Sequence, residues 1–149
     1  MNSENMCMQE VFKRIKKLLY GINYEVSFFL YGPEDSDLSL IEVLKRQVSG
    51  KCELTGVVQS SAKEAIDDIS EKVLYEGSTG SGPLKIESKK KELTSLLNEF
   101  FNFISFEEAE IVCEFGLRQG HPAYPVFWDF AYDIHSQNRR WILIGSSSD

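Results

Sequence analysis

The segment 126–134, Val-Phe-Trp-Asp-Phe-Ala-Tyr-Asp-Ile, constrains the fold more than any other part of this sequence. Its large apolar side chains recur at every second position, which is the period of a β-strand and not of a helix. These apolar residues are Trp128, Phe130, Tyr132 and Ile134. Asp129 and Asp133 lie between them, so the sequence predicts a strand with one apolar face and one face that carries two carboxylates.

Two further strands are predicted beside this one. Residues 109–117 also alternate, and we expect Ile111 or Cys113 to enter the same core as Trp128. The preceding Ser-Phe-Glu-Glu resembles a helix capping box, so a short helix remains an alternative for this segment. Residues 139–145 form the third strand, followed by a polar tail. Short connections between the three segments predict a C-terminal antiparallel three-strand meander.

The first two thirds of the chain alternate between helical and strand patterns. Helices are predicted near 6–20, 37–48, 61–74 and 88–104, and strands at 24–31 and 52–59. The helix 37–48 is a crossover long enough to place its two flanking strands parallel. At 149 residues the chain has the size of one domain. The predicted class is therefore α+β (mixed α/β), a single domain over 1–149 with helices packed on a mixed sheet.

The segment Gly-Ser-Thr-Gly-Ser-Gly-Pro at 77–83 interrupts this pattern. A phosphate-binding P-loop requires a Gly-Lys-Ser/Thr sequence between a strand and a helix, and neither condition is met here. We therefore interpret 77–83 as a flexible Gly/Ser linker.

Charge provides the main indication of function. The formal net charge is −7, whereas phosphate binding requires clustered Lys and Arg, so nucleic acid is not expected as a direct ligand. If the strands 109–117 and 126–134 are neighbours, five carboxylates share one sheet face: Glu108, Glu110, Glu114, Asp129 and Asp133. Native sheets usually intersperse opposite charges on such a face. This pattern predicts a docking surface for a basic protein, although a solvated face of an acidic protein would have the same pattern.

The loop 118–124 is the alternative location for a site. It holds Arg118, Gln119, His121 and Tyr124 between two strands, and functional residues often lie on such loops. A small active site there is the enzymatic hypothesis, while His121 and Tyr124 are also candidate partner contacts. His121 and His135 flank the strand 126–134 from opposite ends, too far apart to share a metal ion. The sequence predicts no metal and no cofactor, and a nonenzymatic function.

Three cysteines are present: Cys7, Cys52 and Cys113. Their number is odd and they form no CxxC pair, which is typical of reduced thiols. The N-terminal residues form no apolar h-region, and no apolar run is long enough to span a membrane. We therefore expect a cytoplasmic protein that does not bind membranes.

In size, acidity and lack of a reactive constellation, the whole chain resembles bacterial immunity proteins of polymorphic toxin systems, including those of contact-dependent growth inhibition. No family motif is matched, so no residue role is transferred. The resemblance implies a protein that neutralises one cognate toxin, often a basic nuclease, by covering its active site. A regulatory or adaptor domain that binds an unrelated protein is the third hypothesis.

Overall fold

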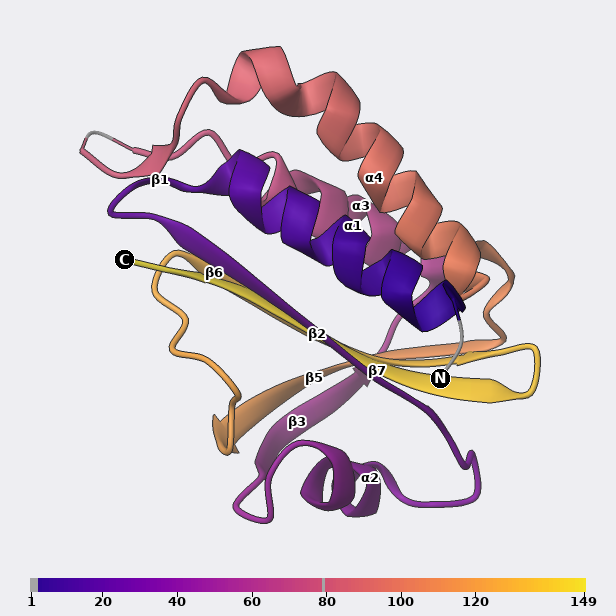
Figure 1. Ribbon diagram of the computed structural model, residues 1–149. Coiled ribbons are helices and arrows are strands. Elements are labelled where there is room, and N and C mark those ends of the chain that lie inside the picture. Colours follow the sequence, from indigo (N-terminus) through magenta and orange to yellow (C-terminus); the bar gives the residue numbers. More distant parts are fainter. Residues whose placement is uncertain (1–2, 79) are drawn as a thin grey trace.

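The molecule has helices on both faces of one central sheet, as the computed structural model, which describes residues 3–78 and 80–149, shows (Figure 1). Three helices cover one face: α1 (Ser3–Leu19), α3 (Ala62–Val73) and α4 (Lys90–Phe103). The short helix α2 (Leu40–Gln47) lies on the other face. None of the helices in the described residues combines the length and the hydropathy that crossing a membrane requires.

The central sheet has five strands in the order β2-β7-β6-β5-β3, and every neighbouring pair is antiparallel. The strands are β2 (Glu25–Glu34), β3 (Glu53–Gln59), β5 (Ile111–Gln119), β6 (Trp128–Ser136) and β7 (Arg139–Ser148). The α+β class and the C-terminal three-strand meander, β5-β6-β7, are therefore confirmed. Of the two alternatives for residues 109–117 the strand is correct, and a 3-10 turn, η2 (Phe106–Glu108), precedes it.

The prediction of a mixed sheet is wrong, because every neighbouring pair of strands is antiparallel. β2 and β3 do run in the same direction, as predicted, but they are not paired with each other. The two strands form opposite edges of the sheet, and β7 lies beside β2. Burial explains this order, because β7 is buried along both faces from Arg140 to Ser147, whereas β3 is mostly exposed. A strand that is apolar on both sides is stable only in the middle of a sheet.

The segment 77–83 is a tight hairpin and not an extended tether between two units. An isolated bridge between Ser78 and Ser81 closes it, and β4 (Gly82–Pro83) then pairs with β1 (Gly21–Ile22). Gly82 and Pro83 are buried. The flexibility predicted for this segment stays a prediction, but its last two residues belong to a two-stranded sheet that links the end of α1 to the segment before α4.

The larger core lies on the face of the sheet that α1, α3 and α4 cover, which we call the helix-covered face. Trp128, Phe130, Tyr132 and Ile134 are all buried in it, as predicted. The Trp128 indole N–H donates a hydrogen bond to the Tyr24 hydroxyl at 2.8 Å, which satisfies both buried polar groups. Ile111, in contrast, is 49% exposed, and Cys113 lies on the opposite face of the sheet. The prediction that one of these two joins Trp128 in the core is wrong.

A second, smaller core lies beneath α2. It joins residues of that helix to the other face of the sheet: Val43, Leu44, Cys52, Phe115, Ala131, Ile142 and Ile144. The central strands β6 and β7 are therefore buried on both sides. The polar tail 146–149 is largely part of β7, since Ser146 and Ser147 are buried and the Ser147 hydroxyl accepts a hydrogen bond from the Trp128 backbone N–H.

Gly145 tests the packing of this central region. It lies opposite Phe130 in the β6–β7 ladder, and a Cβ at this position would overlap the Phe130 ring. We expect Gly145→Ala to lower the free energy of unfolding by about 1–3 kcal/mol, the usual cost of overpacking a core. Gly56→Ala on the edge strand β3 is the matched control, because nothing lies within 4 Å of a Cβ there. Urea unfolding of both variants measures the difference, and an equal stability of the two would contradict this packing.

Candidate protein-binding surface

The β5–β6 register separates the five carboxylates that the sequence places on one face. Cys113 pairs with Asp133, and Glu114 pairs with Tyr132. Residues directly opposite each other in a ladder lie on the same face of the sheet. Glu114 is therefore on the helix-covered face with Tyr132, whereas Asp129 and Asp133 are on the α2 face. The predicted single acidic sheet face is wrong.

Asp133 is also not available to a partner, because it forms a buried ion pair. The Asp133 carboxylate accepts two hydrogen bonds from the Arg140 guanidinium, each of 2.9 Å. Asp133 is 5% exposed and Arg140 is 3% exposed. Arg140 Nη1 also donates to the backbone carbonyl of Leu38 at 2.6 Å. His135 Nε2 lies 3.3 Å from Asp133 Oδ1, the oxygen that also accepts from Arg140 Nε. Asp133 therefore joins β6 and β7 to the chain that leads into α2.

The other predicted contacts are dispersed. Glu108 is exposed in η2, where it accepts a hydrogen bond from the Gln137 side chain, and Glu110 is exposed just before β5. Asp129 is exposed at the start of β6, with its carboxylate 4.0 Å from His121 Nε2. Tyr124 is 81% exposed. Asp129 is thus on the opposite face of the sheet from Glu114.

The loop 118–124 is braced by its own hydrogen bonds. His121 Nδ1 contacts the backbone of Ala123, and burial lowers the pKa of the His121 imidazole. Arg118 pairs with Glu53 on the neighbouring strand β3. Across residues 3–78 and 80–149, no serine, threonine or cysteine is hydrogen-bonded to His121, so the structure adds no nucleophile to the enzymatic hypothesis. An active site in this loop stays a prediction.

A different group of carboxylates forms one surface, which we name the acidic face. Four of its members lie on one side of α3 because their spacing follows the helical period. Glu107 of η2 borders Asp67 and Lys63 on one flank of α3, and Glu114, paired with Tyr132, lies on the strand β5 against which α3 packs. The acidic face consists of Glu64, Asp67, Asp68, Glu71, Glu107 and Glu114.

Tyr132 anchors the centre of this surface. Tyr132 lies on the sheet beneath α3, and its hydroxyl donates a hydrogen bond of 2.6 Å to the Asp68 carboxylate. Burial, the bond to Asp68 and the nearby charges of Glu114 and Glu64 raise the pKa of the Tyr132 hydroxyl far above its usual range. The hydrogen bond between Tyr132 of β6 and Asp68 of α3 joins the acidic side of the helix to the sheet.

The acidic face is only partly neutralised. Its six carboxylates are accompanied by two lysines, Lys63 and Lys72, which pair with Asp67 and Asp68. Glu71, Glu107 and Glu114 have no ion pair within the described part of the chain. Strand alternation does not reveal this surface, because four of its six carboxylates lie on a helix. The helical spacing of Glu64, Asp67, Asp68 and Glu71 was a usable signal.

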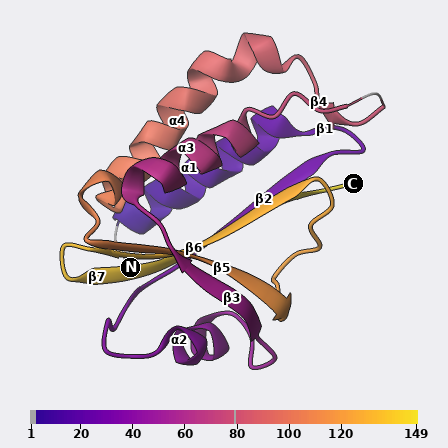
Figure 2. The same cartoon turned by 180° about the vertical axis from the view of Figure 1, so that it is seen from behind.

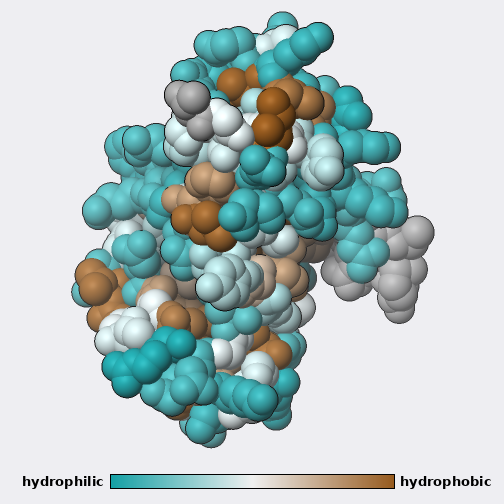
Figure 3. Space-filling view, turned by 90° about the vertical axis from the view of Figure 1, so that its left-hand side faces the viewer, coloured by the Kyte–Doolittle hydropathy of each residue, from teal (hydrophilic) through white to brown (hydrophobic). Residues whose placement is uncertain are grey.

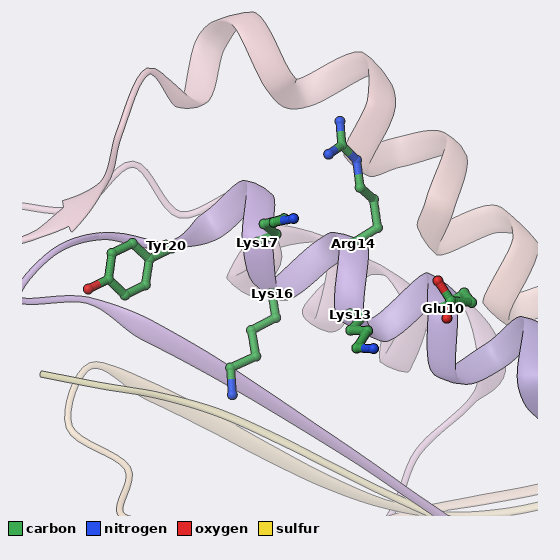
Figure 4. Close-up of a pocket in the computed structure, with 6 residues that line it drawn as sticks. All are labelled: Glu10, Lys13, Arg14, Lys16, Lys17 and Tyr20. Atoms are coloured by element: carbon green, nitrogen blue, oxygen red, sulfur yellow. The ribbon is translucent and has the colours of Figure 1, made fainter.

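A second charged surface lies on α1 and has the opposite sign (Figure 4). It is an open depression of about 650 Å³ lined by Glu10, Lys13, Arg14, Lys16, Lys17 and Tyr20. Arg14 extends toward α4, where it pairs with Glu92 at 2.7 Å, and Lys16 extends toward β2, where it lies 3.5 Å from Glu25. These pairs engage two of the four cations, and Glu10 adds a negative charge, so this surface carries a smaller excess of charge and is the weaker candidate.

Exposed apolar residues do not suggest an alternative at the β1–β4 end of the molecule. Ile22 and Leu84 are about half exposed there. Viewed from that end, hydrophobic residues form several separate patches between hydrophilic ones (Figure 3). Scattered apolar side chains of this kind are normal on a protein surface. Charge is therefore the better guide to a site.

Comparisons with known proteins identify no relative of this chain. No protein-family model matches it, no curated protein matches it, and no solved structure matches it. Within residues 3–78 and 80–149, no three His, Cys, Asp or Glu side chains are grouped as in a metal site. Function is therefore inferred from the surface itself.

Asp133 and Asp129 make a matched pair for testing the corrected assignment of the β6 carboxylates. Asp133→Asn removes the negative partner of Arg140 and leaves a buried charge uncompensated, which costs about 3–5 kcal/mol in the free energy of unfolding. Asp129→Asn changes an exposed side chain and should alter stability by less than about 0.5 kcal/mol. Urea unfolding measures both changes. Equal stability of the two variants would show that Asp133 is not structural.

Proposed function

We propose that this protein acts by binding a basic protein, and that the acidic face is the contact surface. The observation that carries the proposal is the density of carboxylates on α3, η2 and β5: there are six, and two lysines neutralise only Asp67 and Asp68. Exposed charges of one sign repel each other only weakly in salt, so a fold tolerates them. They also attract a partner of opposite charge over several ångströms and accelerate its association.

Hydrogen bonds hold the first turn of α3 and the Asp68 carboxylate of the acidic face in place. Ser61 caps α3 by accepting a hydrogen bond from the Glu64 backbone N–H, which fixes the first turn of the helix. Asp68 is held by the Tyr132 hydroxyl and by Lys72. Carboxylates held in place before binding lose little conformational entropy in the complex.

The class of partner that we propose is a toxin of nuclease type. An enzyme that acts on nucleic acid presents Lys and Arg side chains to the phosphates of its substrate. A rigid group of carboxylates can occupy such a site in place of the phosphates and exclude the substrate. This is the immunity function implied by the resemblance of the sequence, and an adaptor that binds some other basic protein is the alternative within the same proposal.

Two triple variants with equal charge test the proposal. Glu71→Gln, Glu107→Gln and Glu114→Gln together remove three charges from the acidic face, and none of these side chains forms an ion pair or side-chain hydrogen bond in the described residues. The control variant removes three exposed charges elsewhere: Glu10→Gln, Asp37→Asn and Glu99→Gln. Both variants change the net charge of −7 by the same amount.

The full-length wild-type protein is used to capture its partner from the cells that make it, and the captured protein is then purified. We expect a basic protein whose enzymatic activity falls when the wild-type protein binds it. The acidic-face variant should associate roughly tenfold more slowly at low salt, and the control at nearly the wild-type rate. An acidic partner, or equal rates for both variants, would refute the proposed function.

A further inference from the structure

The strand β3 is a free edge of the central sheet. It pairs with β5 on one side, and within the described residues no strand pairs with its other side. From behind, β3 runs along the near margin of the sheet, with α2 below it (Figure 2). Val57 and Val58 point to opposite faces of this strand and are 50% and 64% exposed. Two β-branched side chains are thus exposed beside unpaired backbone groups.

The ladder with β5 shows which backbone groups of β3 are unpaired. The Ser60 backbone N–H donates to the Val112 carbonyl, so Ser60 directs its backbone groups toward β5. Successive residues of a strand alternate in this direction, so Val58 also faces β5. Val57 and Gln59 therefore direct their N–H and C=O groups away from β5. They flank Val58, the residue that pairs with Glu114.

The two edges of the sheet differ in how they are protected. The edge strand β2 carries Pro33 and a bulge between Tyr31 and Glu34, and α1 packs against it. Proline, bulges and covering helices are the usual devices that prevent an edge from pairing with another chain. In β3 the register shifts end at Gly56, and the regular stretch 56–59 contains neither proline nor a charged residue. This stretch is the edge that is open to pairing.

We propose that an extended, basic segment of the partner protein adds to β3 as a sixth strand of the sheet. Val58 and Glu114 are paired, so both side chains lie on the α3 side of the sheet. The added strand would lie about 10 Å from β5, two strand spacings away. A lysine or arginine on it, pointing to the α3 side, would reach Glu114 and the first turn of α3. This inference rests on the proposed function, because it takes the acidic face as the source of charge complementarity.

The same charges argue against a second copy of this chain as the occupant. Two copies paired antiparallel through β3 would bring their two acidic faces to the same side of one continuous sheet. Each face carries six carboxylates and two lysines, so the contact would be repulsive. A basic strand would instead be attracted, because it can pair with the free backbone groups of β3 and neutralise Glu114 at the same time.

A short blocked peptide in which lysine and valine alternate is the probe. We expect it to bind the full chain and to protect the amides of Val57 and Gln59 from hydrogen exchange. Val57→Pro removes one outward N–H without removing a β3–β5 hydrogen bond and should weaken binding at least tenfold. Val57→Thr is the control, because it keeps both the N–H and the β-branched shape. Unchanged exchange in β6 and β7 verifies that each variant is folded.

The outcomes separate this inference from the proposed function. Equal binding of the peptide to wild type and Val57→Pro, or no binding, overturns pairing at β3. Equal binding of a glutamate–valine peptide overturns the basic character of the occupant. A dimer in sedimentation that Val57→Pro abolishes would identify a second copy instead. If capture of the natural partner needs Glu71, Glu107 and Glu114 but tolerates Val57→Pro, the proposed function stands and the added strand does not.

Discussion

The central constraint on this structure is that β6 and β7 are buried on both faces, by α1, α3 and α4 on one side and by α2 on the other. A strand with two buried faces cannot accommodate an unpaired charge, because removing a carboxylate from water without a compensating partner costs a large amount of free energy. Asp133 is retained there only with Arg140, which holds it through two hydrogen bonds and also caps the chain before α2. The ion pair thus ties the two layers together.

This burial moves any binding function to the rim of the sheet. The two faces of the centre are covered, so the accessible parts of the sheet are its edges and the outer sides of its helices. Glu114 lies where these meet, on β5 beneath α3 and next to β3. The free edge at 56–59 therefore lies next to Glu114 of the acidic face, as the proposed binding of one partner segment to both requires.

The distribution of charge follows from the low cost of exposed ions. A surface ion pair contributes at most about 1 kcal/mol, so folding exerts little pressure to neutralise every exposed carboxylate. On the basic side of α1 two of the four cations, Arg14 and Lys16, are paired with Glu92 and Glu25, whereas Glu71, Glu107 and Glu114 have no ion pair among the described residues. An uneven distribution of this kind is expected where selection acts on association and not on stability.

The sequence alone determined the strand 126–134 and its buried residues, because an alternation of large apolar side chains has only one compact solution. It also determined the α+β class and the C-terminal meander. The tertiary structure decided which face of the sheet each residue of β5 occupies, since a shift of one residue in register exchanges Cys113 and Glu114. It likewise decided that Asp133 is buried, because the residues that cover it come from distant parts of the chain. The spacing of the carboxylates along α3 predicts that they share one side of that helix. Which residues of η2 and β5 lie beside them depends on how the helix packs on the sheet, and local periodicity does not encode this.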